Sequence, residues 1–140
     1  MTLRLMPLVG ALAILAALAS CGSSSGPAAP PGDDGGAAIC GCTGANAEDL
    51  TTQTSVTVNF GGASGLNYVP KCILVAPGTQ VSFEGDFATH PLSPTEGSGN
   101  PITHTASGTT AAFIFSAPGA YGYRCDVHFA SGMCGAVYVQ

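Results

Sequence analysis

Positively charged residues are scarce in this sequence of 140 residues, which has three Lys and Arg side chains against eight Asp and Glu. Proteins that bind nucleic acids need basic patches that contact the phosphates. The scarcity of basic residues therefore excludes nucleic acid as a partner. The formal net charge of −5 instead favours partners with positively charged patches.

The sequence also lacks the motifs of the common enzyme classes. It shows no nucleophile–base triad, no glycine-rich phosphate loop and no internal repeat of about 20 to 50 residues. Its length leaves room for one small domain. We therefore expect a binding protein or a carrier, and not an enzyme.

No apolar run is long enough to form a permanent membrane-spanning helix, which needs about 20 residues. The longest run follows Arg4 and ends in the small residues that precede Cys21. This pattern resembles a bacterial lipoprotein signal peptide. We expect residues 1–20 to be removed and Cys21 to be lipidated; the alternative is an ordinary secretory peptide cut nearby. Both place the protein outside the cytoplasm, on the periplasmic face or at the cell surface of a bacterial membrane.

Residues 21–38 are rich in Gly, Ser and Pro and have no apolar period, which predicts a tether between the lipid anchor and a domain. The predicted domain covers residues 39–140. Without the signal peptide, Lys71 and Arg124 remain against eight acidic residues, a formal net charge of −6.

Short alternating runs between turn residues dominate the predicted domain. Residues 54–60 alternate apolar and polar side chains, and residues 72–84 form two apolar runs separated by the turn dipeptide Pro77-Gly78. Residues 110–125 show the same alternation around a second Pro-Gly turn. Regular short strands with frequent turns predict an all-β sandwich or barrel.

The six cysteines of the chain do not divide into three disulfides if Cys21 is lipidated, because five remain. One of the five must have another role. Cys125 is the candidate, since it lies three residues before His128 and eight before Met133. A thiolate, an imidazole and a thioether on one loop form a soft ligand set that selects copper.

A blue-copper site needs a second imidazole, and two histidines remain in the chain. His90 follows the predicted strand of residues 79–84, so a sandwich could place it at the same end as the Cys125 loop. His104 lies in a stretch rich in Ser, Gly and Pro and could be a surface residue. We expect His90 to be the second imidazole.

The C-terminal stretch "GAYGYRCDVHFASGM" resembles the signature of the cupredoxins, in particular of the plastocyanin and pseudoazurin type. The resemblance covers about Ser55 to Gln140. It implies a Greek-key β-sandwich that binds one type 1 copper ion. The residues that match the signature are Gly119, Tyr121, Tyr123, Cys125, His128 and Met133.

Carried over from the family, the copper ligands are His90, Cys125, His128 and, as a long axial ligand, Met133. The chain departs from the family at Pro91, where Asn is usual. In the family this residue braces the Cys loop by hydrogen bonds. Pro has no backbone donor, so the bracing must differ here.

Four cysteines remain as disulfide candidates, with three possible pairings. We expect a Cys72–Cys134 bridge, which would pin the copper loop to the sandwich. Cys40 and Cys42 would then pair with each other, or else cross-link to the other two. The alternative role of Cys40 and Cys42 is to bind Cu(I) through their two free thiols as a Cys-x-Cys motif.

We expect a monomeric one-electron carrier that meets redox partner proteins, such as other carriers or oxidases, in transient encounters. His128 is the predicted electron port. The predicted docking patch around it is apolar and consists of Phe129, Ala130, Pro91 and Leu92. The alternative function is copper buffering or delivery by a lipoprotein. A metal-free cupredoxin-like domain would require a missing ligand, and all four are present.

Overall fold

The structure, a computed structural model, describes residues 38–140. The predicted signal peptide, the predicted lipidation site at Cys21 and all but the last residue of the predicted tether lie outside this range. Three short 3-10 helices occur within it: η1 (Gly44–Asn46), η2 (Gly62–Ser64) and η3 (Phe129–Ser131). The strands are β1 (Glu48–Asp49), β2 (Ser55–Phe60), β3 (Tyr68–Val69), β4 (Cys72–Val75), β5 (Thr79–Glu84), β6 (Leu92–Pro94), β7 (Thr110–Phe115), β8 (Gly119–Cys125) and β9 (Cys134–Val139).

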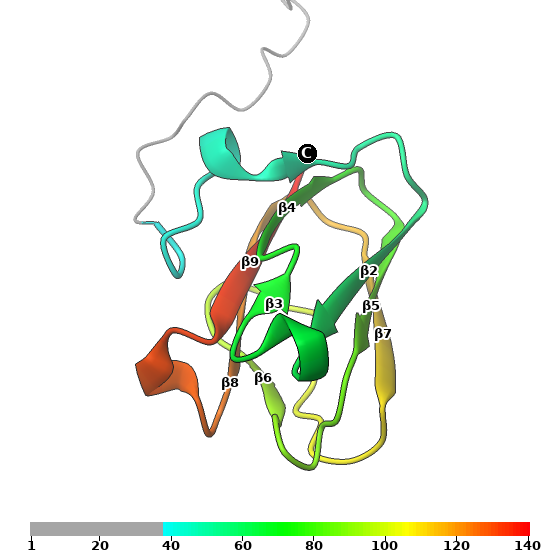
Figure 1. The fold of residues 1–140 in the computed structure, drawn as a ribbon. Coiled ribbons are helices and arrows are strands. Elements are labelled where there is room, and N and C mark those ends of the chain that lie inside the picture. Colours follow the sequence, from blue (N-terminus) through cyan, green and yellow to red (C-terminus); the bar gives the residue numbers. More distant parts are fainter. Residues whose placement is uncertain (1–37) are drawn as a thin grey trace, which may run out of the picture.

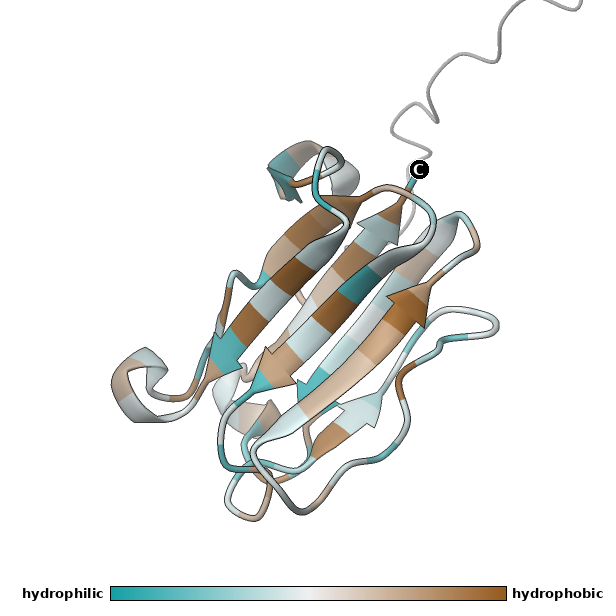
Figure 2. Ribbon diagram, turned by 90° about the vertical axis from the view of Figure 1, so that its right-hand side faces the viewer, coloured by the Kyte–Doolittle hydropathy of each residue, from teal (hydrophilic) through white to brown (hydrophobic). Residues whose placement is uncertain are grey.

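Several strands form where side chains alternate between core and solvent, as the sequence predicted, whereas β9 is buried at five of its six positions. In β2, Val56, Val58 and Phe60 are buried and the residues between them are exposed. The predicted turn separates β4 from β5, and Gly78 supplies its positive φ of 91°. Apolar and polar bands alternate along the strands of the sheet that faces the viewer in Figure 2.

Two mixed sheets pack face to face and enclose one hydrophobic core (Figure 1). One sheet has the strand order β1-β4-β9-β8-β6 and the other β3-β2-β5-β7. Parallel pairs join β1 to β4, β4 to β9 and β2 to β5, and the remaining pairs are antiparallel. The expected all-β sandwich is confirmed. Within residues 38–140, no helix has the length and apolar character needed to cross a membrane.

The register of β8 and β9 places the Cys125 loop at one end of the sandwich. Gly119 pairs with Val139 and Arg124 with Cys134. The carboxyl terminus therefore lies at the opposite end from the Cys125 loop (Figure 1).

Two disulfides attach residues 38–47, here called the N-terminal strap, to the five-stranded sheet. Cys40 is bonded to Cys134 and Cys42 to Cys72. The expected Cys72–Cys134 bridge is therefore wrong, and the cross-linked alternative is the one observed. The physical reason is register, because Cys72 on β4 lies opposite Ala136 of β9, two residues beyond Cys134. The strap supplies a partner for each cysteine instead.

Candidate metal centre

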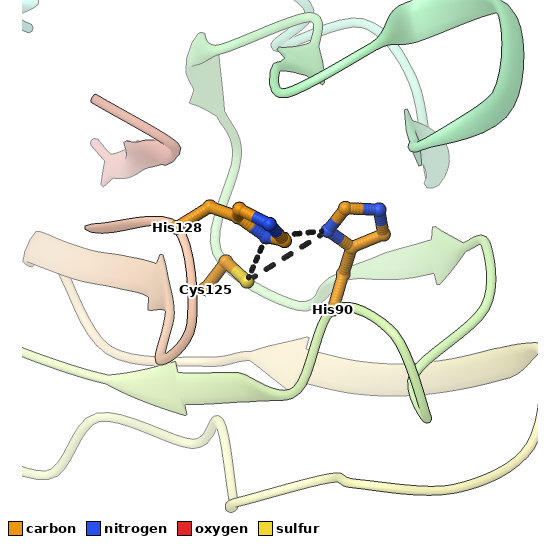
Figure 3. A group of neighbouring side chains, drawn as sticks. All are labelled: His90, Cys125 and His128. Atoms are coloured by element: carbon orange, nitrogen blue, oxygen red, sulfur yellow. Dashed lines mark hydrogen bonds between the residues drawn. The ribbon is translucent and has the colours of Figure 1, made fainter. Parts of the chain in front are cut away.

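Three side chains with soft or imidazole ligand atoms converge at the end of the sandwich where β8 ends. The ligand atoms of His90, Cys125 and His128 all lie within 4.8 Å of one another. The two Nδ1 atoms are 3.0 Å apart, and the Cys125 Sγ lies 3.9 Å from Nδ1 of His90 and 3.6 Å from Nδ1 of His128. Figure 3 shows the two rings and the sulfur pointing toward one another.

This triangle of atoms has the dimensions of a trigonal metal site. In zinc sites the metal–nitrogen and metal–sulfur bonds are about 2.0 and 2.3 Å long, which at trigonal angles separates two nitrogens by roughly 3.5 Å and nitrogen from sulfur by roughly 3.7 Å. Each distance in the triangle lies within about half an ångström of these values. Two imidazoles and one thiolate in trigonal array are the donor set of a blue-copper site. The residues present therefore fit copper.

A carboxylate-capped turn after β5 presents His90 to the centre. The Asp86 carboxylate accepts hydrogen bonds from the Ala88 N–H at 3.0 Å and the Thr89 hydroxyl at 2.7 Å. The backbone carbonyl of Asp86 also accepts the N–H of His90 at 2.9 Å. Asp86 thus holds both the turn and the backbone of the histidine at its end.

Cys125 is aligned with His90 through the pairing of β6 and β8. Leu92 of β6 lies opposite Cys125. The N–H of Asp126 donates to the carbonyl of Pro91 at 2.9 Å. Pro91 follows His90, and Asp126 follows Cys125. This hydrogen bond therefore joins the two segments that carry the converging side chains, with the Pro91 carbonyl as the acceptor. This contact needs no N–H from Pro91, which is the donor that proline lacks.

The loop after Cys125 carries His128 and returns to β9 through η3. The N–H of Met133 donates to the His128 carbonyl at 3.2 Å, and the Met133 carbonyl accepts from the Cys125 N–H at 2.9 Å. Met133 is fully buried. The backbone of this methionine therefore ties the cysteine and the second histidine into one closed loop.

Burial and the nearby His128 favour the neutral form of the His90 ring. His90 is 8% exposed and Cys125 is fully buried, whereas His128 is half-buried. Burial lowers the pKa of His90, and the nearby His128 lowers it further, while Asp86 opposes both effects. The neutral imidazole is the form that binds metals.

His104, the other histidine considered as a ligand, lies outside this cluster. Its side chain is 59% exposed, and its Nδ1 lies 3.4 Å from the Asp126 carboxylate. The same Nδ1 is 3.0 Å from the Ser93 hydroxyl, which donates to Asp126 at 2.7 Å. His104 thus belongs to a polar surface group beside the centre.

Packing around His90 involves residues that sequence reasoning did not identify. The Phe60 ring meets the His90 ring edge-on, with centroids 6.2 Å apart. The backbone of Gly61 lies against the same ring. No sequence signal marks these two residues, because β2 meets the His90 turn only in the folded sandwich. The Asp-x-x-Thr pattern that begins at Asp86 is a local turn signal and could have been recognised.

The family to which the sequence can be matched agrees with this geometry. Residues 54–140 match the family model of copper-binding proteins of the plastocyanin/azurin family. No curated protein sequence matches the chain. Among solved structures, pseudoazurin from Methylobacterium extorquens is 22% identical, with a TM-score of 0.47 over 61% of this chain and 74% of that one.

Two further solved structures are similar to the chain. A mutant fern plastocyanin is 23% identical, with a TM-score of 0.47 over 60% of this chain and 99% of that one. Auracyanin from the photosynthetic bacterium Roseiflexus castenholzii is 21% identical, with a TM-score of 0.45 over 63% of this chain and 98% of that one. The family-model match covers more than half of the sequence, and the chain therefore belongs to the plastocyanin/azurin family of copper-binding proteins, with copper as its cofactor.

Proposed function

We propose that the protein is a one-electron carrier in which His90, Cys125 and His128 bind copper and Met133 is the axial ligand. The convergence of the first three ligand atoms at a largely buried point carries this proposal. When bound, copper supplies a Cu(I)/Cu(II) couple that takes up and releases one electron. The task of the chain is then to hold the ligands in one geometry for both states.

The closed backbone of the Cys125 loop supports that task. Cys125, His128 and Met133 are linked by two backbone hydrogen bonds, and Cys125 is fixed to β6 as well. Met133 lies in this loop and is fully buried, which suits a ligand whose thioether is shielded from water. A site restrained in this way changes little when its charge changes, which favours rapid electron exchange.

His128 is the proposed electron port, because it is half-buried whereas His90 and Cys125 are buried. Val127 and Phe129 beside it are 63% and 47% exposed. An apolar patch of this kind suits the small, transient interfaces of redox partners. The expected patch did not include Val127, and its member Leu92 is fully buried and cannot contact a partner.

The alternative of copper buffering or delivery receives less support. It depended on free thiols at Cys40 and Cys42, and both are in disulfides. Among the described residues, Cys125 is the free cysteine. We propose a carrier without an enzymatic activity of its own.

Cycling of the copper-loaded protein separates the two functions. We expect a visible absorption band that bleaches with one electron equivalent of reductant, returns on reoxidation, and survives dialysis against a moderate chelator. Reversible colour without loss of copper supports the carrier. Rapid exchange of copper with the chelator would favour buffering or delivery.

We also propose that the protein is exported and anchored through a lipid on Cys21. The two disulfides support export, because such bonds persist in oxidising compartments. Labelling of cells with a fatty-acid analogue should mark the wild-type protein and not Cys21→Ser. Equal labelling of both, or none in either, would contradict a lipid anchor at Cys21.

A further inference from the structure

Tyr68 has a buried hydroxyl without a partner. The residue is 1% exposed, and within residues 38–140 no hydrogen-bond partner lies within reach of its hydroxyl oxygen. A buried polar group without a partner loses its hydration and gains nothing in return. Phenylalanine would fill the same space without that loss. The hydroxyl therefore calls for an explanation other than stability.

The ring of Tyr68 lies between the residues that support two of the proposed ligands. It meets the Tyr123 ring at right angles, with centroids 4.9 Å apart, and Tyr123 precedes Cys125 by two residues on β8. The Tyr68 ring also packs against the Phe60 ring, with centroids 5.5 Å apart, and Phe60 contacts the ring of His90. Tyr68 therefore belongs to the core side chains that pack against Phe60, the neighbour of His90, and against Tyr123, which lies on the strand that carries Cys125.

The two neighbouring phenols differ in what their hydroxyls face. The Tyr123 hydroxyl donates to the Lys71 carbonyl at 2.8 Å. Burial raises the pKa of both tyrosines, but only for Tyr68 do the negative charges of Cys125 and Asp126 raise the pKa further. The Tyr68 hydroxyl is thus within electrostatic reach of the proposed thiolate ligand, whereas the Tyr123 hydroxyl is already engaged elsewhere.

We propose that the Tyr68 hydroxyl tunes the reduction potential of the copper centre. With no partner to fix it, the O–H bond can rotate until its proton is directed at the negative charge of Cys125. The oxidised centre carries one more positive charge than the reduced centre. A dipole with its positive end toward the site disfavours the oxidised state and raises the potential, and the effect is strong in a low-dielectric core. Tyr68 stays protonated in both states.

The test compares Tyr68→Phe with the matched control Tyr123→Phe. Spectroelectrochemical titration of the copper-loaded proteins should show a lower potential for Tyr68→Phe and an unchanged potential for Tyr123→Phe. In urea unfolding of the metal-free proteins, Tyr68→Phe should shift the midpoint to higher urea. Tyr123→Phe should shift it to lower urea, because a satisfied hydrogen bond is lost. Tyr68→Leu also lacks the hydroxyl and should lower the potential as well.

An unchanged or raised potential in Tyr68→Phe, or an equal shift in both phenylalanine variants, would overturn the proposal. A lower urea midpoint for metal-free Tyr68→Phe would overturn it too, because the hydroxyl would then have a stabilising partner. The inference rests on the proposed function, and the two fail differently. If the copper-loaded wild type shows no visible band, the proposed carrier function is wrong. If the band is present but Tyr68→Phe, Tyr123→Phe and Tyr68→Leu have equal reduction potentials, only the proposed role of Tyr68 is wrong.

Discussion

Gly61 lies against the imidazole of His90 at the end of β2. A side chain on Gly61 would place its Cβ 3.1 Å from Cδ2 and 3.3 Å from Nε2 of that ring. The opposite nitrogen, Nδ1, faces Cys125 and His128. The chain at Gly61, just after β2, thus limits how far the His90 ring can retreat from the metal centre.

Gly61→Ala should push the His90 ring and shift the visible and spin-resonance spectra of the copper-loaded protein. Gly62→Ala is the matched control. Both glycines have positive φ, 67° and 50°, but a Cβ on Gly62 would meet no atom within 4 Å. Each alanine should cost about 1–3 kcal/mol of unfolding free energy through backbone strain, and the cost should be larger at Gly61, whose φ of 67° and ψ of −170° are almost exclusive to glycine. Identical spectra for the two variants would show that contact with Gly61 does not constrain His90.

Asp86→Ala should weaken copper binding, because the turn that carries His90 loses its hydrogen bonds to Ala88 and Thr89. Asp49→Ala is the control, since Asp49 makes two similar hydrogen bonds to Thr51. Competition with a copper chelator should show a higher dissociation constant for Asp86→Ala alone. An equal change in both variants would assign the effect to general loss of stability.

Acid should abolish the contribution of Asp86 to stability. Hydrogen bonds from Thr89 and Ala88 hold the pKa of this carboxyl below its ordinary value of 3.8. The folded state therefore binds its proton less readily than the unfolded state, so the contribution is complete above that value and is lost as pH falls below it. The difference in unfolding free energy between wild type and Asp86→Ala should shrink below about pH 4. A constant difference down to pH 2.5 would contradict this role of the carboxylate.

Removal of either disulfide should destabilise the protein, and more so for the one that closes the longer loop. The sequence separations are 94 for Cys40–Cys134 and 30 for Cys42–Cys72. Chain entropy alone predicts losses of about 4.7 and about 3.6 kcal/mol. Double serine variants of each pair, unfolded in urea, check the order. Peptide mapping without reduction checks the pairing, and a Cys72–Cys134 peptide would contradict it.

The strands and the cysteine-loop motif could be predicted because their signals are local. Alternation over Ser55–Phe60 reports directly which side chains face a core. The spacing of Cys125, His128 and Met133 places three soft donors on one loop whatever the rest of the chain does. The convergence of His90 on that loop could be expected only from the order of the strands.

The disulfide pairing and the packing around His90 could not be read from the sequence. Pairing depends on whether Cys72 lies opposite Cys134 or opposite Ala136, and a shift of two residues preserves the alternation that the sequence shows. The contact of Gly61 with His90 joins two segments that meet only in three dimensions. Both features are properties of register and tertiary packing.

His90→Ala should abolish or strongly change the visible band, because the centre loses one of the three converging ligand atoms. His104→Ala should leave the spectrum unchanged, since this exposed ring contacts Ser93 and Asp126 and lies outside the cluster. Absorption spectra of the two copper-loaded variants make the comparison. The reverse result would transfer the ligand role to His104.

The absorption spectrum of the copper-loaded wild type beside Cys125→Ser tests the central claim most directly. We expect one copper per chain and an intense visible band from the bond between copper and the Cys125 sulfur. In Cys125→Ser that band should be absent while the far-ultraviolet circular dichroism of the β-sandwich is retained. A wild type that binds copper without the band, or a Cys125→Ser variant that keeps it, would contradict the assignment of a type 1 site to His90, Cys125 and His128.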